Sequence, residues 1–150
     1  MHHHHIVPPL VARGRIALTE PELTAWGEQF GHAVRPPLVV ALSGDLGSGK
    51  TTLVKAICRG AGVGAEVTSP TFALVHRYEG SRGAVYHLDL YRLGSPDELT
   101  NLGWDDIVGE HALILVEWAE RAGRRLPADA VSIELEHLDG DPARRVLMAG

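Results

Sequence analysis

The first regular pattern of apolar and polar positions in the chain is that of an amphipathic helix. Thr19 and Glu22 have the spacing of a capping box, in which a hydroxyl and a carboxylate satisfy backbone N–H groups at a helix start. Apolar or small residues then recur three or four positions apart, at Leu23, Trp26, Gly27, Phe30 and Ala33. This spacing predicts a helix over residues 20–33 with one buried face.

Two runs of consecutive apolar residues predict strands that are buried on both faces. They occupy residues 38–42 and 112–116, and neither has polar alternation. Such runs are typical of the central strands of a parallel sheet. Between them, a helix is predicted over residues 51–59, because helix-compatible residues there follow one glycine-rich turn and precede another.

Four further segments alternate between apolar and polar positions, as half-buried strands do. Segments 73–78 and 84–91 flank a turn at 79–83, and segments 131–135 and 145–147 flank a turn at 139–141. A second capping box, from Ser95 to Glu98, predicts a short helix toward Leu102. These elements predict an α/β fold: a single-domain three-layer sandwich with a mostly parallel central sheet plus antiparallel C-terminal strands.

Composition narrows the class of protein without naming its chemistry. The chain has 150 residues, which suits one domain, and a 45% hydrophobic content typical of a globular protein. Its apolar runs are far shorter than the roughly 20 residues that cross a bilayer, so no membrane span is expected. A net charge of −5 argues against a broadly basic nucleic-acid-binding surface, although a partner can hold the nucleic acid instead. The single cysteine, Cys58, excludes an internal disulfide.

The N-terminus carries a run of histidines. Residues 1–5, a methionine followed by four histidines, are interpreted as the remnant of an affinity tag, which leaves residues 6–150 as the domain. The five remaining histidines share no metal-ligand spacing, so a structural zinc site is not expected. No signal-peptide pattern follows the tag, and we expect a cytoplasmic protein.

The segment 44–51 carries the strongest chemical signal. Its sequence, Gly-Asp-Leu-Gly-Ser-Gly-Lys-Thr, matches the phosphate-binding P-loop, and it lies between a predicted strand and a predicted helix. In such a loop Lys50 contacts the β- and γ-phosphates, and the Thr51 hydroxyl is a ligand of Mg²⁺. The residues expected to contact the nucleotide here are Asp45, Leu46, Gly47, Ser48, Gly49, Lys50, Thr51 and Thr52.

Two carboxylates are candidates for the second acidic element that Mg²⁺ and hydrolysis require. Glu117 directly follows the apolar run 112–116, as expected of a Walker B element, and Asp89 lies in a more polar strand. Either one can also be an ordinary exposed carboxylate at a strand end. If both act, one holds the metal and the other lies near the attacking water.

A third segment, Thr-Ser-Pro-Thr-Phe at 68–72, lies between the predicted P-loop helix and the next strand. Its hydroxyls suit a loop that senses the γ-phosphate or Mg²⁺. An ordinary proline-containing turn explains the same residues equally well.

Taken together, segments 44–53, 68–72, 86–92 and 116–118 resemble the TsaE (YjeE) family, small bacterial ATPases of tRNA threonylcarbamoyladenosine synthesis. The resemblance runs from about Ile16 to the C-terminal hairpin. The P-loop alone is shared by very many proteins, whereas the ordered set of segments is specific. One departure is Ala119, where the family pattern leads us to expect proline.

The resemblance implies roles for individual residues. Thr51 and Glu117 would hold Mg²⁺, Asp89 would be needed for hydrolysis, and Thr71 would belong to a switch loop near the γ-phosphate. Weaker implications place Trp118 and Glu120 near the nucleotide and Glu20 beside the adenine. Without the resemblance, Trp118 is an ordinary packing aromatic.

The resemblance also implies partners. A TsaE-like protein is expected to bind the TsaB–TsaD complex, in which TsaD transfers the carbamoyl group to tRNA adenosine. Its ATPase would be weak alone and partner-dependent, and tRNA would be contacted only through the partners. The acidic net charge agrees with this arrangement.

Three other functions remain as alternatives. A small P-loop kinase would need an acceptor pocket and an arginine-bearing lid, for which the chain offers only Arg121, Arg124 and Arg125. A GTPase-type switch would need an Asn-Lys-x-Asp element, which is absent, although residues 106–109 fit Asp-x-x-Gly. A scaffold that keeps a nucleotide without turning it over would show negligible hydrolysis with every partner.

Overall fold

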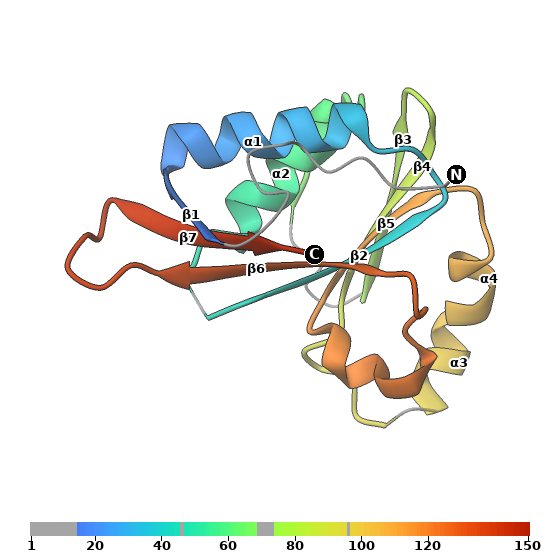
Figure 1. The fold of residues 1–150 in the computed structure, drawn as a ribbon. Helices are drawn as coiled ribbons and strands as arrows, with labels where there is room; N and C mark the ends of the chain where they lie inside the picture. Colours follow the sequence, from blue (N-terminus) through green and yellow to red (C-terminus); the bar gives the residue numbers. More distant parts are fainter. Residues whose placement is uncertain (1–14, 46, 69–73, 96) are drawn as a thin grey trace.

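The computed structural model describes residues 15–45, 47–68, 74–95 and 97–150 as one seven-stranded mixed sheet with helices on both faces (Figure 1). The elements, in chain order, are β1 (Arg15–Thr19), α1 (Glu20–Ala33), β2 (Leu38–Gly44), α2 (Lys50–Gly60), β3 (Val75–Gly80), β4 (Gly83–Asp89), α3 (Asp97–Leu102), α4 (Trp104–Val108), β5 (Leu113–Glu117), the 3₁₀ segment η2 (Ala119–Arg125), β6 (Val131–His137) and β7 (Arg144–Ala149). The predicted single-domain α/β fold is confirmed.

The order of strands in the sheet is β1-β7-β6-β2-β5-β4-β3. Strands β6, β2, β5 and β4 run parallel to one another, while β3 pairs antiparallel with β4, β7 with β6, and β1 with β7. The predicted antiparallel C-terminal strands are therefore present, and a second antiparallel pair lies at the opposite edge. Parallel pairing places the carboxyl ends of β2, β4 and β5 at one edge of the sheet, where Glu117 is the register partner of both Leu42 and Asp89.

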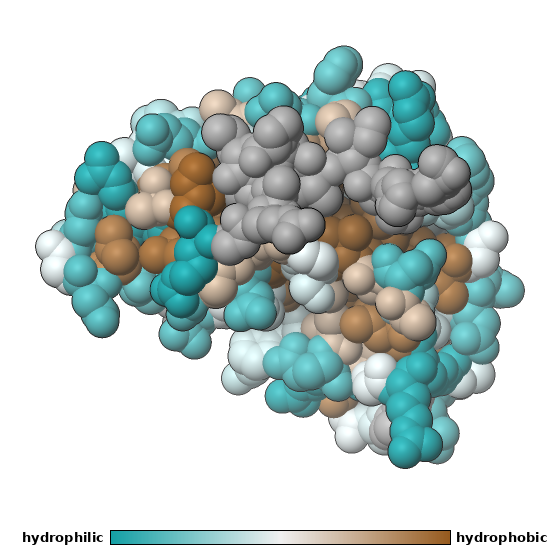
Figure 2. All heavy atoms as spheres, viewed as in Figure 1, coloured by the Kyte–Doolittle hydropathy of each residue, from teal (hydrophilic) through white to brown (hydrophobic). Residues whose placement is uncertain are grey.

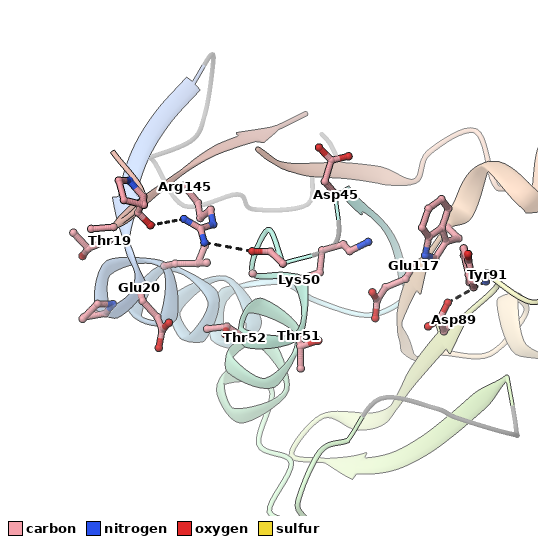
Figure 3. A pocket seen from close by; sticks show the side chains of 17 residues that line it. Thr19, Glu20, Asp45, Lys50, Thr51, Thr52, Asp89, Tyr91, Glu117 and Arg145 are labelled. Atoms are coloured by element: carbon pink, nitrogen blue, oxygen red, sulfur yellow. Dashed lines mark hydrogen bonds between the residues drawn. The ribbon is translucent and has the colours of Figure 1, made fainter. Parts of the chain in front are cut away.

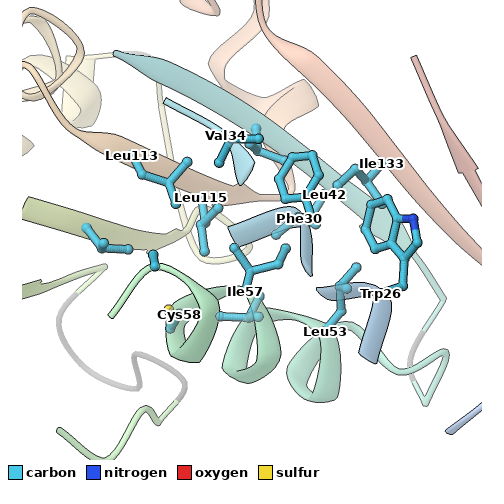
Figure 4. Close-up of a cluster of buried hydrophobic side chains, with 14 of the residues drawn as sticks. Trp26, Phe30, Val34, Leu42, Leu53, Ile57, Cys58, Leu113, Leu115 and Ile133 are labelled. Atoms are coloured by element: carbon cyan, nitrogen blue, oxygen red, sulfur yellow. The ribbon is translucent and has the colours of Figure 1, made fainter. Parts of the chain in front are cut away.

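Helices α1 and α2 cover one face of the sheet. They enclose a first hydrophobic cluster, which includes Phe30, Ile57 and Leu115 (Figure 4). Trp26 and Phe30 stack with their ring centroids 5.1 Å apart. The two helices approach closely at Gly31, where a Cβ atom would lie 2.0 Å from the Ile57 carbonyl oxygen. Four of the five predicted face positions are buried; at the end of the helix Gly31 is buried, and the predicted Ala33 is only half-buried.

The opposite face of the sheet, at its β5–β4 end, is covered by α3, α4 and η2 (Figure 1). The helix α4 is absent from the sequence prediction, in which residues 101–105 read as polar. Trp104 and Ile107 are in fact buried in this second cluster, and the Trp104 indole N–H donates to the Arg125 carbonyl oxygen at 3.1 Å. The Asp-x-x-Gly match at 106–109 therefore lies in and just after this helix, not at the end of a buried strand.

Strand β1 is also absent from the prediction, because only Leu18 of its five residues is buried and the strand lies at the sheet edge. Other differences concern boundaries. The P-loop helix begins at Lys50 instead of Thr51, β4 ends at Asp89 instead of Tyr91, and β5 begins at Leu113 instead of Ala112. The strand predicted over residues 73–78 is shifted by two residues toward the C-terminus, to Val75–Gly80.

The surface is largely hydrophilic around the periphery of the face drawn in Figure 2. Among the described large hydrophobic side chains, Tyr91 stands out as exposed, at 53%. No helix within the described residues has the length and apolar character that a membrane span requires.

Burial of Cys58 generates a prediction about pH and stability. Removal from water raises the pKa of its thiol to about 12. In the unfolded chain a thiol ionises near pH 8.5–9, so between about pH 9 and 12 the folded state holds a proton that the unfolded state has lost. This term therefore makes stability fall as pH rises above about 9, by at most about 1.4 kcal/mol per pH unit. We expect urea unfolding of the Cys58→Ala variant to show a shallower decline above pH 9 than the parent.

The thiol itself supplies the control for that experiment. Because Cys58 is fully buried, a thiol reagent at pH 8 should modify it only in urea. Rapid modification of the native protein, or identical pH dependence in both proteins, would contradict the burial argument.

Candidate functional site

The glycine-rich loop joins the end of β2 to the start of α2 in the backbone conformation that its glycines permit. Gly44, Gly47 and Gly49 have φ angles of 149°, 78° and 103°. At Gly44 a Cβ would lie 2.6 Å from the Leu135 carbonyl oxygen, so a larger residue cannot replace it without moving β6. The P-loop predicted from sequence thus has the strand–loop–helix context that the motif requires.

The first turn of α2 presents backbone N–H groups that no side chain caps. The N-cap of this helix is Gly49, and its first turn has no acidic residue. The helix dipole and the free N–H groups therefore favour an anion at this end. This is the arrangement that binds phosphate in P-loop proteins.

A cavity of about 1160 Å³ opens in front of this loop, large enough for a nucleoside triphosphate (Figure 3). Ten of the site residues predicted from the sequence line this cavity: Glu20, Asp45, Gly47, Gly49, Lys50, Thr51, Thr52, Asp89, Glu117 and Trp118. The structure thus brings together residues from α1, the P-loop, α2 and the ends of β4 and β5.

Four predicted residues stand outside this group. Ser48 is fully buried under the loop, and its N–H donates to the Asp45 carbonyl oxygen at 3.0 Å. Glu120 is exposed and lines a smaller cavity of about 340 Å³ beside Lys50 and Trp118. The predictions for Leu46 and Thr71 fall outside the described residues.

The two candidate carboxylates lie side by side at the ends of parallel strands β4 and β5. Glu117 is 6% exposed, and one of its oxygens, Oε2, lies 2.6 Å from Nε2 of His87. Asp89 is half-buried, and its Oδ1 accepts the Tyr91 backbone N–H at 3.0 Å. Glu117 is therefore not an ordinary exposed strand-end carboxylate.

The residues at this edge suit a magnesium ion held partly by a nucleotide. The Thr51 hydroxyl and the Glu117 carboxylate line the same cavity, and both offer the hard oxygen atoms that Mg²⁺ prefers. Within the described ranges, no three His, Cys, Asp or Glu side chains gather as a ligand set. A metal bound here would complete its shell with phosphate oxygens and water, as Mg²⁺ commonly does.

Trp118 is both a packing residue and a wall of the cavity. It adopts the left-handed conformation, with φ of 58°, directly after β5. The Lys50 ammonium lies 5.0 Å from the centroid of its ring, within the range of a cation–π contact. The centroids of the Tyr91 and Trp118 rings are 4.9 Å apart, and the Arg121 guanidinium lies over both rings.

Sequence reasoning missed two residues of this site. Arg145, on β7, lines the cavity and donates to the Gly47 carbonyl oxygen at 3.3 Å and to that of Pro142 at 2.8 Å. No sequence signal identifies it, because its contact with the P-loop joins residues that are 98 positions apart. His87 had a signal: it is a polar residue in a predicted strand, two positions before Asp89 and therefore on the same face.

Comparison with known proteins agrees with this geometry. The sequence model of the family described as "Threonylcarbamoyl adenosine biosynthesis protein TsaE" matches residues 18–146. The chain is 38% identical to the tRNA threonylcarbamoyladenosine biosynthesis protein TsaE of Treponema pallidum, over 83% of this chain and 90% of that one. It is 37% identical to TsaE of Bacillus subtilis, over 75% and 69% of the two chains.

The fold is also similar to a solved structure, that of Bacillus subtilis YdiB. The TM-score is 0.70 at 27% identity, and the superposition covers 91% of this chain and 86% of the other. The match of the family model over most of the chain, together with these relatives, shows that the chain belongs to the TsaE family of threonylcarbamoyladenosine biosynthesis proteins.

Proposed function

We propose that this protein binds Mg²⁺–ATP and hydrolyses it, weakly alone and faster with the TsaB–TsaD complex. The observation that carries the proposal is the convergence of Lys50, Thr51, Asp89 and Glu117 on one cavity in front of an uncapped helix N-terminus. Membership of the TsaE family supports placing this activity in the synthesis of tRNA threonylcarbamoyladenosine.

The phosphates would bind to the P-loop backbone and the first turn of α2. Loop N–H groups and the helix dipole stabilise their negative charge, and the Lys50 ammonium would lie against the β- and γ-phosphates. Lys50 must leave the Trp118 ring for this purpose. A surface cation–π contact is worth only about 0.5–1 kcal/mol, so a phosphate dianion competes for the ammonium with ease.

Thr51 and Glu117 would hold the Mg²⁺ ion. When bound, the metal neutralises charge that builds on the phosphate oxygens during transfer to water. Asp89 would orient the attacking water, because it lies beside Glu117 in register and its Oδ1 is fixed by the Tyr91 N–H. Thr71 would contact the γ-phosphate from the 68–72 loop.

The nucleoside would occupy the end of the cavity farther from Glu117. Thr52 lies in the first turn of α2, and Pro21, Leu23 and Ala143 supply apolar walls there. Glu20, at the start of α1, offers a carboxylate that can accept a hydrogen bond from the adenine amino group. Trp118 and Glu120 would lie near the nucleotide on the opposite side.

The biological role follows if the nucleotide state changes the affinity for the TsaB–TsaD complex. A ligand shifts an assembly only when it binds two states with different free energies, and a γ-phosphate sensed at Thr71 and Asp89 meets that condition. The tRNA would be held by the partners, in agreement with a net charge of −5. We propose that this happens in the cytoplasm, without contact with a membrane.

One prediction of this proposal concerns hydrolysis and its dependence on the partners. We expect Mg²⁺-dependent release of phosphate from ATP, stimulated by purified TsaB–TsaD, with Lys50→Ala reducing the stimulated rate about 10²–10³-fold through loss of charge stabilisation. The measurement is steady-state phosphate release with and without partners. A rate that the partners leave unchanged would contradict the coupling, and transfer of phosphate to an acceptor would favour the kinase alternative.

Another prediction of the proposal separates the roles of Glu117 and Asp89. Glu117→Gln should weaken nucleotide binding in Mg²⁺ while leaving binding in EDTA unchanged, because only the metal interaction is lost. Asp89→Asn should leave both affinities unchanged and slow hydrolysis about 10²–10⁴-fold, the usual contribution of a group that acts on a proton or water. Glu79→Gln, at an exposed position near the end of β3, is the matched control. The opposite pattern in the two variants would exchange the assigned roles.

A further inference from the structure

His87 is a buried polar residue behind the proposed metal site, and neither the motif nor the family comparison assigns it a role. It lies on β4, 1% exposed, opposite Leu115 in the parallel pairing with β5. The next pair on the same face of these two strands, two residues further along, is Asp89 and Glu117. The imidazole is therefore one step back from the carboxyl ends of the strands, on the face that carries the nucleotide cavity.

The contact between His87 and Glu117 is short and almost fully removed from water. Nε2 of the imidazole lies 2.6 Å from Oε2 of the carboxylate, and the two side chains are 2% and 8% exposed. A carboxylate that binds a metal is ionised and only accepts hydrogen bonds, so in that state the donor is the Nε2–H of His87. The other ring nitrogen, Nδ1, has no hydrogen-bond partner among the described residues.

We propose that His87 is a positioning residue: its Nε2–H fixes Oε2 of Glu117 and leaves Oε1 free to bind Mg²⁺. The inference rests on the proposed function, in which Glu117 is a metal ligand. It goes further by assigning the orientation of that ligand to a specific donor. Partners that hydrogen-bond a ligating carboxylate commonly change metal affinity about 10–100-fold when they are removed.

A purely structural explanation of His87 accounts poorly for these observations. An apolar side chain would pack between Val85 and Leu115 without the cost of burying two polar nitrogens. A buried pair of polar groups also adds little to the free energy of unfolding, because both partners lose their hydration on burial. What the imidazole provides, and an apolar residue cannot, is a donor at a fixed place on one oxygen of Glu117.

The test compares substitutions that keep or lose this donor. His87→Gln can place an amide N–H near the Nε2 position, His87→Asn places it near Nδ1, and His87→Leu has no donor. For each variant we would measure by calorimetry the affinity for AMPPNP in Mg²⁺ and in EDTA. The ratio of the two affinities reports the metal interaction without any need for hydrolysis.

We expect His87→Leu and His87→Asn to lower this ratio about 10–100-fold, with the affinity in EDTA within twofold of the parent. His87→Gln should restore most of the ratio. In a Glu117→Gln background the same His87 substitutions should have no further effect, because the donor acts through that carboxylate.

Val85→Ala, two residues earlier on the same strand face, is the control for loss of buried packing. An equal fall in the ratio for Val85→Ala, equal ratios for the Gln and Asn variants, or a persistent effect in the Glu117→Gln background would overturn the proposal. If His87→Leu fails to fold, the Gln and Asn pair still decides the question. If Glu117→Gln itself leaves the ratio unchanged, the metal role of Glu117 fails; if only the His87 variants are without effect, the positioning role alone fails.

Discussion

Parallel pairing of β2, β5 and β4 is the constraint on which the remaining structure depends. Because parallel strands end at the same edge of a sheet, this pairing places the P-loop, Glu117 and Asp89 around one space. The same pairing makes the three strands central, and both faces must then be covered by apolar contacts. Burial of every residue of β5, including the terminal Glu117, is a consequence of that position.

The packing of α1 on α2 fixes the other half of the site. Three glycines, at 27, 31 and 60, allow the backbones of the two helices to approach so closely that a Cβ would overlap the facing helix. Because α2 begins at Lys50, its packing against α1 also fixes the position of its N-terminus at the site. The start of α1 also contributes Thr19 and Glu20 to the cavity wall. The capping box of Thr19 and Glu22 therefore acts both on the helix and on the site that borders it.

What the sequence could predict is what local interactions determine. The helix over 20–33 has its own cap and periodicity, the P-loop is a contiguous motif, and the runs before it and before Glu117 are too apolar for anything but buried strands. Strand β1 escaped prediction because its pairing with β7 joins the two ends of the chain. Helix α4 escaped because Trp104 and Ile107 are two apolar positions among acidic ones, and only tertiary packing makes them a face.

The contacts of Arg145 and His87 also join residues far apart in the chain, but only the contact of His87 could be anticipated from the sequence. Arg145 reaches Gly47 from a strand whose place in the sheet depends on β6 and β2, so no spacing along the chain implies it. His87 is fixed by the period of a single strand relative to Asp89, and needs only the pairing of β4 with β5 to meet Glu117. A polar residue at an inward position of a central strand, two residues from a candidate catalytic acid, is therefore a signal that sequence alone can supply. The short Nε2–Oε2 distance turns that signal into a specific claim about one oxygen of one carboxylate.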